Sequence, residues 1–237
     1  MPHHLVRGIL KNNHGSISKA ITLIENSESP PEPFFSDIHK NSFNSVRIGI
    51  TGPPGAGKST LTSSLIEFCL ADGKEVGVIA VDPTSPFTGG ALLGDRVRMN
   101  KYVGDNRVFL RSMGNHCDLG GLSSKVQEIG DVLAASGKDY IFFETVGVGQ
   151  GEHDIINVAD ISIVVLVPES GDEIQLMKAG LIEIADIFVI NKSDREGSNR
   201  IASTLKNILH IFKKQDRREP SVFNTIANKQ EGVLELF

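Results

Sequence analysis

The chain has 237 residues and a formal net charge of −5, with 24 lysines and arginines against 29 aspartates and glutamates. Hydrophobic residues make up 40% of it, which excludes a wholly disordered or fibrous chain. The acidic balance excludes the basic surface of a dedicated nucleic-acid-binding protein, so we expect no nucleic-acid partner. At roughly 150 residues per domain, the length predicts one large domain with an appendage, or two small domains.

Leader sequences, apolar runs and cysteines indicate the compartment. The opening residues, MPHHLVRGIL, lack the continuous apolar run and small-residue cleavage site of a secretory signal. The longest apolar run, 161–167, is far short of the roughly 20 residues that cross a bilayer, so no membrane partner is expected. Cys69 and Cys117 have no paired spacing and predict free thiols. We therefore expect a cytoplasmic protein, or one of the mitochondrial matrix if the source is a eukaryote.

The first 45 residues differ from the rest of the chain. Ile17, Ile21 and Ile24 follow the spacing of an amphipathic helix. The stretch 29–33, Ser-Pro-Pro-Glu-Pro, is typical of a linker because proline removes backbone donors and disfavours helix before it. We expect an N-terminal helical appendage and linker over 1–45, followed by the main domain over 46–237.

From residue 46 onward, short apolar runs alternate with helical patterns. The strand candidates are 46–51, 76–81, 140–143, 161–167, 187–190 and 222–223. Nearly continuous β-branched runs of this kind are typical of strands buried on both faces of a parallel sheet. The helix candidates between them are 59–71, 122–135, 172–183 and 198–212. The pattern predicts an α/β fold with three layers and a mostly parallel sheet.

A phosphate-binding loop follows the first predicted strand. The motif G-x-x-x-x-G-K-[ST] opens the next helix, and its glycines let the backbone N–H groups surround a triphosphate. Lys58 would reach the β- and γ-phosphate oxygens, and the Ser59 hydroxyl would bind Mg²⁺. The candidate phosphate-binding residues are Gly52, Pro53, Pro54, Gly55, Ala56, Gly57, Lys58, Ser59 and Thr60. This motif by itself leaves ATP and GTP equally open.

The sequence Asn191-Lys192-Ser193-Asp194 after the fifth strand candidate indicates the base. The Asp194 carboxylate can accept hydrogen bonds from guanine N1–H and from the 2-amino group, neither of which adenine offers. An unpaired buried polar group would penalise the wrong base. Asn191 would brace the loop, and the stem of Lys192 would lie along the base. The order of motifs therefore favours GTP and GDP as ligands.

Acidic residues end two more strand candidates. Asp82 and Glu144 lie where ligands bind in α/β sheets, so they could hold Mg²⁺ through water, and the Gly147 N–H could contact the γ-phosphate. The alternative is that these acids cap turns. The loop 84–96 is rich in glycine and hydroxyl side chains, which is typical of a switch that γ-phosphate and Mg²⁺ order.

Five strings together resemble the MeaB/ArgK-type GTPases. They are GPPGAGKST, VDPTSPFTGGALLGDRVRM, ETVGVGQ, PESGDEIQLMKAG and NKSD, and the resemblance covers about 46–227. It implies a Mg²⁺-dependent GTPase that serves as an accessory protein, or chaperone, of an adenosylcobalamin-dependent mutase of the methylmalonyl-CoA type.

The resemblance also implies roles for single residues. Lys58, Asp95 and Glu144 would be catalytic, with Asp95 orienting the attacking water and joining Ser59, Asp82 and Glu144 at the metal. Ala227 would join the guanine site. The residues of the switches and the partner surface would be Thr88, Gly89, Gly90, Gln150, Asp172 and Lys178. Without the resemblance, 172–183 reads as an amphipathic surface helix.

Two departures from the pattern of this family keep other interpretations of the function open. The loop 225–228, Thr-Ile-Ala-Asn, lacks the serine that such GTPases place before the alanine. The chain also ends before the C-terminal dimerisation helices of the family, so a homodimer is possible while its usual arm is absent. The alternatives are a GTP-dependent metallochaperone, for which His116-Cys117 is weak support, a GTP-binding module with little hydrolysis, and a kinase.

Overall fold

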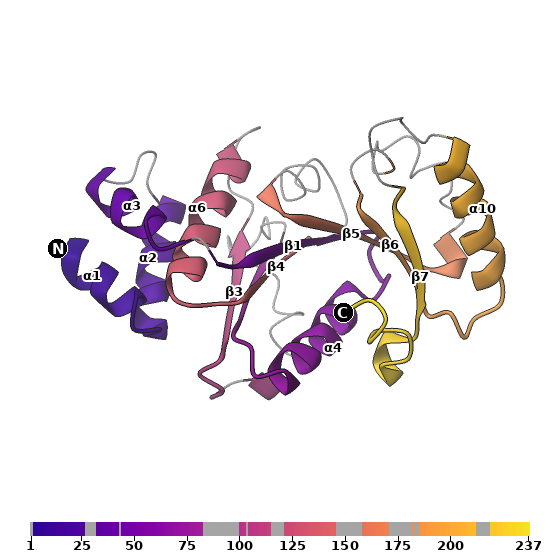
Figure 1. Ribbon diagram of the computed structural model, residues 1–237, viewed down its shortest axis with the longest axis horizontal. Coiled ribbons are helices and arrows are strands. Elements are labelled where there is room, and N and C mark those ends of the chain that lie inside the picture. Colours follow the sequence, from indigo (N-terminus) through magenta and orange to yellow (C-terminus); the bar gives the residue numbers. More distant parts are fainter. Residues whose placement is uncertain are drawn as a thin grey trace, which may run out of the picture. The chain divides into compact units, whose positions relative to one another are not determined.

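The computed structural model describes residues 2–26, 32–42, 44–82, 100–102, 104–114, 121–145, 158–170, 182, 185–211 and 219–237. Among these residues, seven strands form one sheet in the order β3-β2-β4-β1-β5-β6-β7 (Figure 1). The strands are β1 (Val46–Thr51), β2 (Val76–Asp82), β3 (Val108–Gly114), β4 (Tyr140–Thr145), β5 (Ile161–Leu166), β6 (Ile187–Asn191) and β7 (Ser221–Thr225).

Four pairings in the described part of the sheet are parallel. β1 pairs with β5, β2 with β3, β5 with β6 and β6 with β7, each in parallel register. The central strands are buried, as the apolar runs predict: Ile163, Val164 and Val165 are at most 3% exposed. The predicted α/β fold with a mostly parallel sheet is confirmed, and parallel pairing places the carboxyl ends of these strands along one edge.

Strand β3 is absent from the sequence prediction. It lies at the edge of the sheet, and its sequence, VFLRSMG, is interrupted by Arg111 and Ser112. The Arg111 guanidinium pairs with Glu25 of helix α2 (His14–Asn26). An edge strand that carries such polar contacts has no continuous apolar run, so its sequence does not indicate a buried strand.

Three of the four predicted helices of the main domain are present. They are α4 (Lys58–Ala71), α6 (Gly121–Ala135) and α10 (Ser198–Ile211). The fourth, 172–183, lies outside the described residues except for 182. Short 3₁₀ turns are η1 (Asn100–Tyr102), η2 (Pro168–Ser170) and η3 (Ala227–Lys229).

The chain divides into two compact units, and the first comprises Met1–Arg47 and Cys69–Phe143. In this unit α2 and α3 (Glu32–His39) pack against α6, and α1 (Pro2–Ile9) packs against α2 and α3 (Figure 1). The isoleucines of the predicted helix, Ile17, Ile21 and Ile24, are fully buried. Helix α3 begins inside the stretch predicted as a linker, with Pro33 in its first turn, where a missing N–H costs no helical hydrogen bond. The domain boundary near residue 45 stays a prediction.

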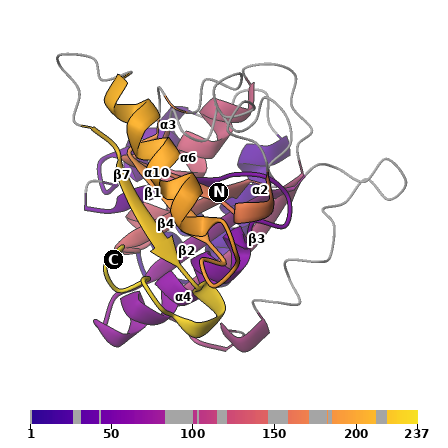
Figure 2. The same ribbon diagram turned by 90° about the vertical axis from the view of Figure 1, so that its right-hand side faces the viewer.

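The second unit comprises Ile48–Phe68 and Glu144–Phe237. Its core joins β5, β6 and α10, with Val164 and Phe188 packed against Leu205 and Leu209. Helix α4 lies on the opposite side of these strands from α10 (Figure 1), and α10 runs beside β7 (Figure 2). The phosphate loop, Ser59, Thr62, Glu144 and the base motif, described below, all belong to this unit.

No helix in the described part of the chain is long and apolar enough to cross a membrane.

Candidate functional site

The loop between β1 and α4 has a backbone that requires glycine. Gly52, Gly55 and Gly57 have φ angles of +138°, +76° and +90°. A Cβ on Gly52 would lie 2.0 Å from the Val165 carbonyl oxygen, and one on Gly57 would lie 2.3 Å from Asn191 Nδ2. The glycines of the motif therefore allow both the turn and the close approach of β5 and the Asn191 side chain.

Lys58 is the first residue of α4 and is only 6% exposed. Its Nζ donates to the Gly52 carbonyl oxygen at 2.8 Å and to the Pro53 carbonyl oxygen at 3.1 Å. The cation is thus held inside the loop, beside a helix N-terminus whose backbone N–H groups also favour negative charge. A phosphate group in this loop would meet both the ammonium and the helix N-terminus.

Ser59, Thr62 and Glu144 form a buried cluster of oxygen atoms behind Lys58. Ser59 Oγ donates to Glu144 Oε1 at 2.5 Å, and Thr62 Oγ1 lies 3.0 Å from Glu144 Oε2. Thr62 is fully buried, and Glu144 is 3% exposed. A carboxylate and a hydroxyl are the hard oxygen ligands that Mg²⁺ takes together with phosphate oxygens, so the residues present fit such an ion.

Thr62 was not among the predicted site residues. Its hydroxyl is also 3.0 Å from the Lys58 carbonyl oxygen, one turn earlier in α4. No motif marks this threonine, because its contact with Glu144 joins residues 82 positions apart. Asp82 ends β2 at the register partner of Gly114, as predicted for a strand-end acid, and its side chain lies outside what the structure describes.

Asn191 connects three loops of the site. Its Nδ2 donates to the Ala56 carbonyl oxygen at 2.9 Å. Its Oδ1 accepts from Thr225 Oγ1 at 3.2 Å and from the Ala227 backbone N–H at 3.0 Å. The side chain is 3% exposed and has both its donor and its acceptor engaged. The phosphate loop and the loop after β7 are therefore held to the end of β6 by one carboxamide.

Lys192 adds a second link between the base motif and the phosphate loop. Its backbone has a φ of +56°, an uncommon value for a residue with a side chain, and its Nζ donates to the Gly55 carbonyl oxygen at 2.8 Å. The lysine stem thus lies along the opening between the two loops.

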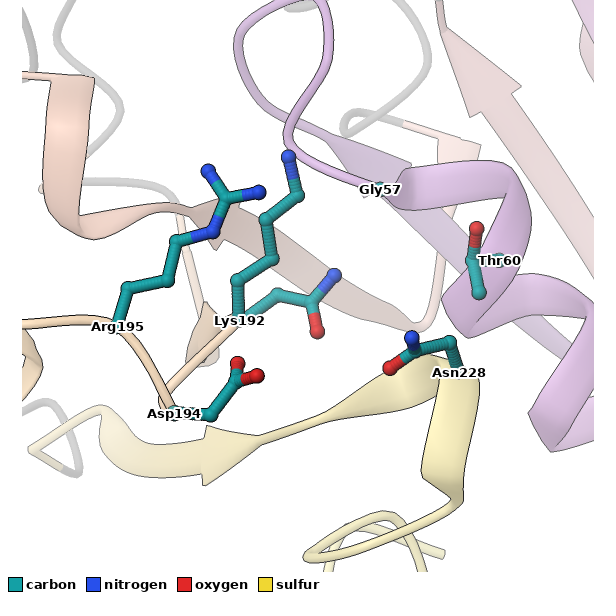
Figure 3. Close-up of a pocket in the computed structure, with 7 residues that line it drawn as sticks. Gly57, Thr60, Lys192, Asp194, Arg195 and Asn228 are labelled. Atoms are coloured by element: carbon teal, nitrogen blue, oxygen red, sulfur yellow. The ribbon is translucent and has the colours of Figure 1, made fainter.

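A cavity of about 220 Å³ lies beside these loops. Figure 3 shows its residues: the carboxylate of Asp194 and the carboxamide of Asn228 point toward one another across the space. The residues around it are Gly57, Thr60, Asn191, Lys192, Asp194, Arg195 and Asn228. Thr60, assigned to phosphate from the sequence, lies here with the base motif. Arg195 and Asn228 were not among the predicted site residues: Arg195 belongs to no motif, and in the loop 225–228 only Ala227 was assigned to the base.

Arg195 forms an ion pair with Glu169 of η2 at the rim of the cavity. The hydrogen bond from the Arg195 guanidinium holds the pKa of the Glu169 carboxyl below its usual range. Both side chains are half exposed, so the pair orients Arg195 and contributes little to stability.

Eight of the predicted site residues lie outside the described residues. They are Thr88, Gly89, Gly90, Asp95, Gly147, Gln150, Asp172 and Lys178. The pair His116-Cys117 also falls outside them. Within the ranges that the structure describes, no group of three or more His, Cys, Asp or Glu side chains is arranged to hold a metal ion.

Comparison with known proteins gives a consistent result. A family model described as "Methylmalonyl Co-A mutase-associated GTPase MeaB" matches residues 17–237. A Pyrococcus horikoshii protein is 47% identical over 236 residues, which cover 98% of this chain and 74% of that protein. GTPase ArgK of Escherichia coli is 35% identical over an alignment of 241 residues, covering 98% of this chain and 72% of the relative.

A solved structure shares the fold across nearly the whole chain. The crystal structure of LAO/AO transport system kinase matches with a TM-score of 0.78 and 28% identity, covering 99% of this chain and 72% of that one. The phosphate loop, the base motif and the matches over most of the sequence agree, and the chain belongs to the MeaB family of methylmalonyl-CoA mutase-associated GTPases.

Proposed function

We propose that this protein is a Mg²⁺-dependent GTPase that hydrolyses GTP to GDP and phosphate as an accessory protein of an adenosylcobalamin-dependent mutase of the methylmalonyl-CoA type. The observation that carries the proposal is the Asn191 side chain, which bonds to the phosphate loop and to the loop after β7. One residue of the base motif thus sets the distance between a phosphate site and a base site. The printed name of the family supports the mutase as partner.

The phosphates would be bound by the backbone of 52–57, by Lys58 and by the N-terminus of α4. Lys58 already donates to two loop carbonyl oxygens, so its ammonium needs little movement to meet a phosphate oxygen. We assign the γ-phosphate contact of the second switch to the Gly147 N–H. Catalysis then depends on position and on neutralised charge, with no covalent intermediate.

Ser59 and Glu144 would hold the metal, with Asp82 and Asp95 completing its shell through water. When bound, Mg²⁺ supplies charge neutralisation at the β- and γ-phosphate oxygens. Thr62 keeps one Glu144 oxygen in place while the other oxygen faces Ser59 Oγ. We assign the orientation of the attacking water to Asp95.

The base would be read by Asp194, with the Lys192 stem along the ring and Asn191 and Ala227 bracing the site. Asp194 lines the cavity and its carboxylate points into it (Figure 3). A carboxylate there accepts from the N1–H and 2-amino groups that distinguish guanine from adenine. This contact gives the proposal its preference for GTP over ATP.

The partner surface and the switches would comprise Thr88, Gly89, Gly90, Gln150, Asp172 and Lys178. We propose that the protein acts in the cytoplasm or, in a eukaryotic cell, in the mitochondrial matrix. Cys69 supports a reducing compartment: it is a free, buried thiol, and burial raises its pKa to about 12.

The test is phosphate release from GTP and from ATP, with and without Mg²⁺ and with and without a purified adenosylcobalamin-dependent mutase from the same source. We expect slow release that needs Mg²⁺, prefers GTP and rises with the mutase. Tight GTP binding without release under any condition would instead favour the GTP-binding module. Transfer of a labelled phosphate to a protein or metabolite would favour a kinase.

A further inference from the structure

In the loop after β7, the backbone donor of Ala227 is already engaged. The Ala227 N–H lies 3.0 Å from Asn191 Oδ1, and Ala227 is 2% exposed. The residue before it, Ile226, has no polar side-chain group. A base that enters the cavity therefore needs another donor for its remaining acceptor atoms, because Asp194 offers only acceptors.

Asn228 is the next residue, and it lines the cavity. Its carboxamide points across the cavity toward Asp194 (Figure 3). No hydrogen bond holds the Asn228 side chain among the parts of the chain that the structure describes. By contrast, two other donors at the cavity are engaged: Lys192 with the Gly55 carbonyl oxygen and Arg195 with Glu169.

The backbone that carries Asn228 is fixed by its neighbours. Ser64 Oγ of α4 donates to the Ala227 carbonyl oxygen at 2.8 Å. The Lys229 N–H donates to the Ile226 carbonyl oxygen at 2.8 Å, and Gln230 closes the turn with a φ of +60°. A Cβ on Gly232 would lie 2.1 Å from the Asn224 carbonyl oxygen, so the chain returns tightly here. The direction of the Asn228 side chain is thus set before any ligand binds.

The chemistry of the two facing side chains complements a guanine edge. The N1–H and 2-amino groups are donors that suit the Asp194 carboxylate, while the 6-keto oxygen and N7 are acceptors. The Asn228 carboxamide has two N–H donors. The Asn228 side chain can therefore donate to the acceptor atoms of guanine. The Ala227 N–H cannot serve them, because it is bonded to Asn191 Oδ1.

We propose that Asn228 is a specificity-determining residue that donates from its side chain to the 6-keto and N7 edge of the guanine base. This inference rests on the proposed function, because it adds a second contact to the base site of the same nucleotide. Both sides of the cavity then select the base: Asp194 accepts hydrogen bonds from the donor groups of guanine, and Asn228 donates to its acceptor atoms.

Equilibrium binding of four nucleoside diphosphates tests the assignment. GDP, IDP, 6-thio-GDP and ADP are titrated into the full chain, its Asn228→Ala and Asn228→Asp variants, and the neighbouring control Lys229→Ala. IDP lacks the 2-amino group that Asp194 reads, and 6-thio-GDP has a weaker acceptor at the 6 position. Thermal melting checks that each variant is folded.

We expect Asn228→Ala to weaken GDP about 3-fold to 10-fold, the usual net effect of one hydrogen bond. The preference for GDP over 6-thio-GDP should shrink, while the preference for GDP over IDP stays. Asn228→Asp should weaken GDP further, because a carboxylate would face the 6-keto oxygen. Lys229→Ala should match the unchanged chain.

The two proposals fail in different ways. An unchanged chain that binds ADP as tightly as GDP would overturn the guanine site itself. A chain that selects GDP over ADP, but whose Asn228→Ala variant keeps the full preference over 6-thio-GDP, would overturn only the role of Asn228. In that case Asn228→Ala weakens GDP and 6-thio-GDP equally, which would indicate a packing role and no hydrogen bond to the 6 position.

Discussion

Two buried lysines, Lys58 of the second compact unit and Lys138 of the first, have different kinds of partner. Lys58 follows the carboxyl end of β1 and donates to the carbonyl oxygens of Gly52 and Pro53. Lys138 precedes the amino end of β4 and donates to Glu75 Oε2 at 2.8 Å and to the Arg107 carbonyl oxygen at 3.2 Å. Each is less than one-tenth exposed.

The difference separates a cation that serves a ligand from one that serves the fold. Lys138 has a carboxylate partner from the chain itself, and Asn12 of the turn between α1 and α2 joins the same Glu75 oxygen. The charge of Lys138 is thereby neutralised within the protein. The neutral carbonyl oxygens around Lys58 can instead be replaced by phosphate oxygens, which carry full negative charge.

Lys58→Ala should produce the largest effect. Removing the ammonium from the phosphate loop should lower GTP hydrolysis by at least about 100-fold, a typical loss for one charge-stabilising group. The melting temperature should change little, because the loop carbonyls can bond to water. Phosphate release and thermal melting measure both, with Lys206→Ala on the exposed face of α10 as the control. Hydrolysis at the original rate would contradict the site assignment.

Lys138→Met should have the opposite effect to Lys58→Ala: it should lower stability and leave the nucleotide site intact. The change removes the buried ammonium that bonds to Glu75 and to the Arg107 carbonyl oxygen, and it should lower the free energy of unfolding by about 2–3 kcal/mol. The loss is below that of a fully buried ion pair because Glu75 keeps 35% of its side-chain exposure. Urea unfolding measures it. If the variant kept its stability but lost affinity for GDP, Lys138 would serve the ligand and not the fold, contrary to the comparison.

Thr62→Val should produce a smaller effect that is confined to the metal. The change keeps the shape of the side chain but removes the hydroxyl that faces Glu144 Oε2, at 3.0 Å. The Mg²⁺ concentration needed to slow GDP release should rise about 3-fold to 10-fold, which corresponds to one lost hydrogen bond. GDP affinity in EDTA should stay the same, and Thr62→Ser should restore the response. Equal losses with and without Mg²⁺ would indicate a packing defect.

The pH dependence of stability should show the smallest effect. Burial lowers the pKa of Lys138, and the ion pair with Glu75 offsets this only in part. Between the lowered folded value and the usual one, the unfolded chain binds more protons, so stability rises with pH in that alkaline window. The slope stays below about 1.4 kcal/mol per pH unit, the limit for one proton. Urea unfolding at pH 8 and pH 10 should show a growing gap between the unchanged chain and Lys138→Met; a shrinking gap would contradict the direction.

Local patterns predicted the parts of the fold that depend on neighbouring residues. The apolar runs at 140–143 and 187–190 correspond to β4 and β6, and the helix pattern at 122–135 corresponds to α6. The phosphate loop was predictable for the same reason: its glycines, lysine and serine act at adjacent positions. β3 was missed because the polar contacts of an edge strand interrupt the apolar run that the prediction uses.

The sequence by itself determined the motifs, their order and the α/β class, because periodicity and short spacing are properties of the chain. Only the tertiary structure decided which side chains meet. It placed Thr62 on Glu144, joined Asn191 to Ala227 and turned Asn228 toward Asp194. These arrangements join residues far apart in the sequence, and they depend on the strand order and on the close approach of loops at the carboxyl ends of the strands. The two buried lysines show the same point, since only their surroundings distinguish a site for a ligand from a support for the fold.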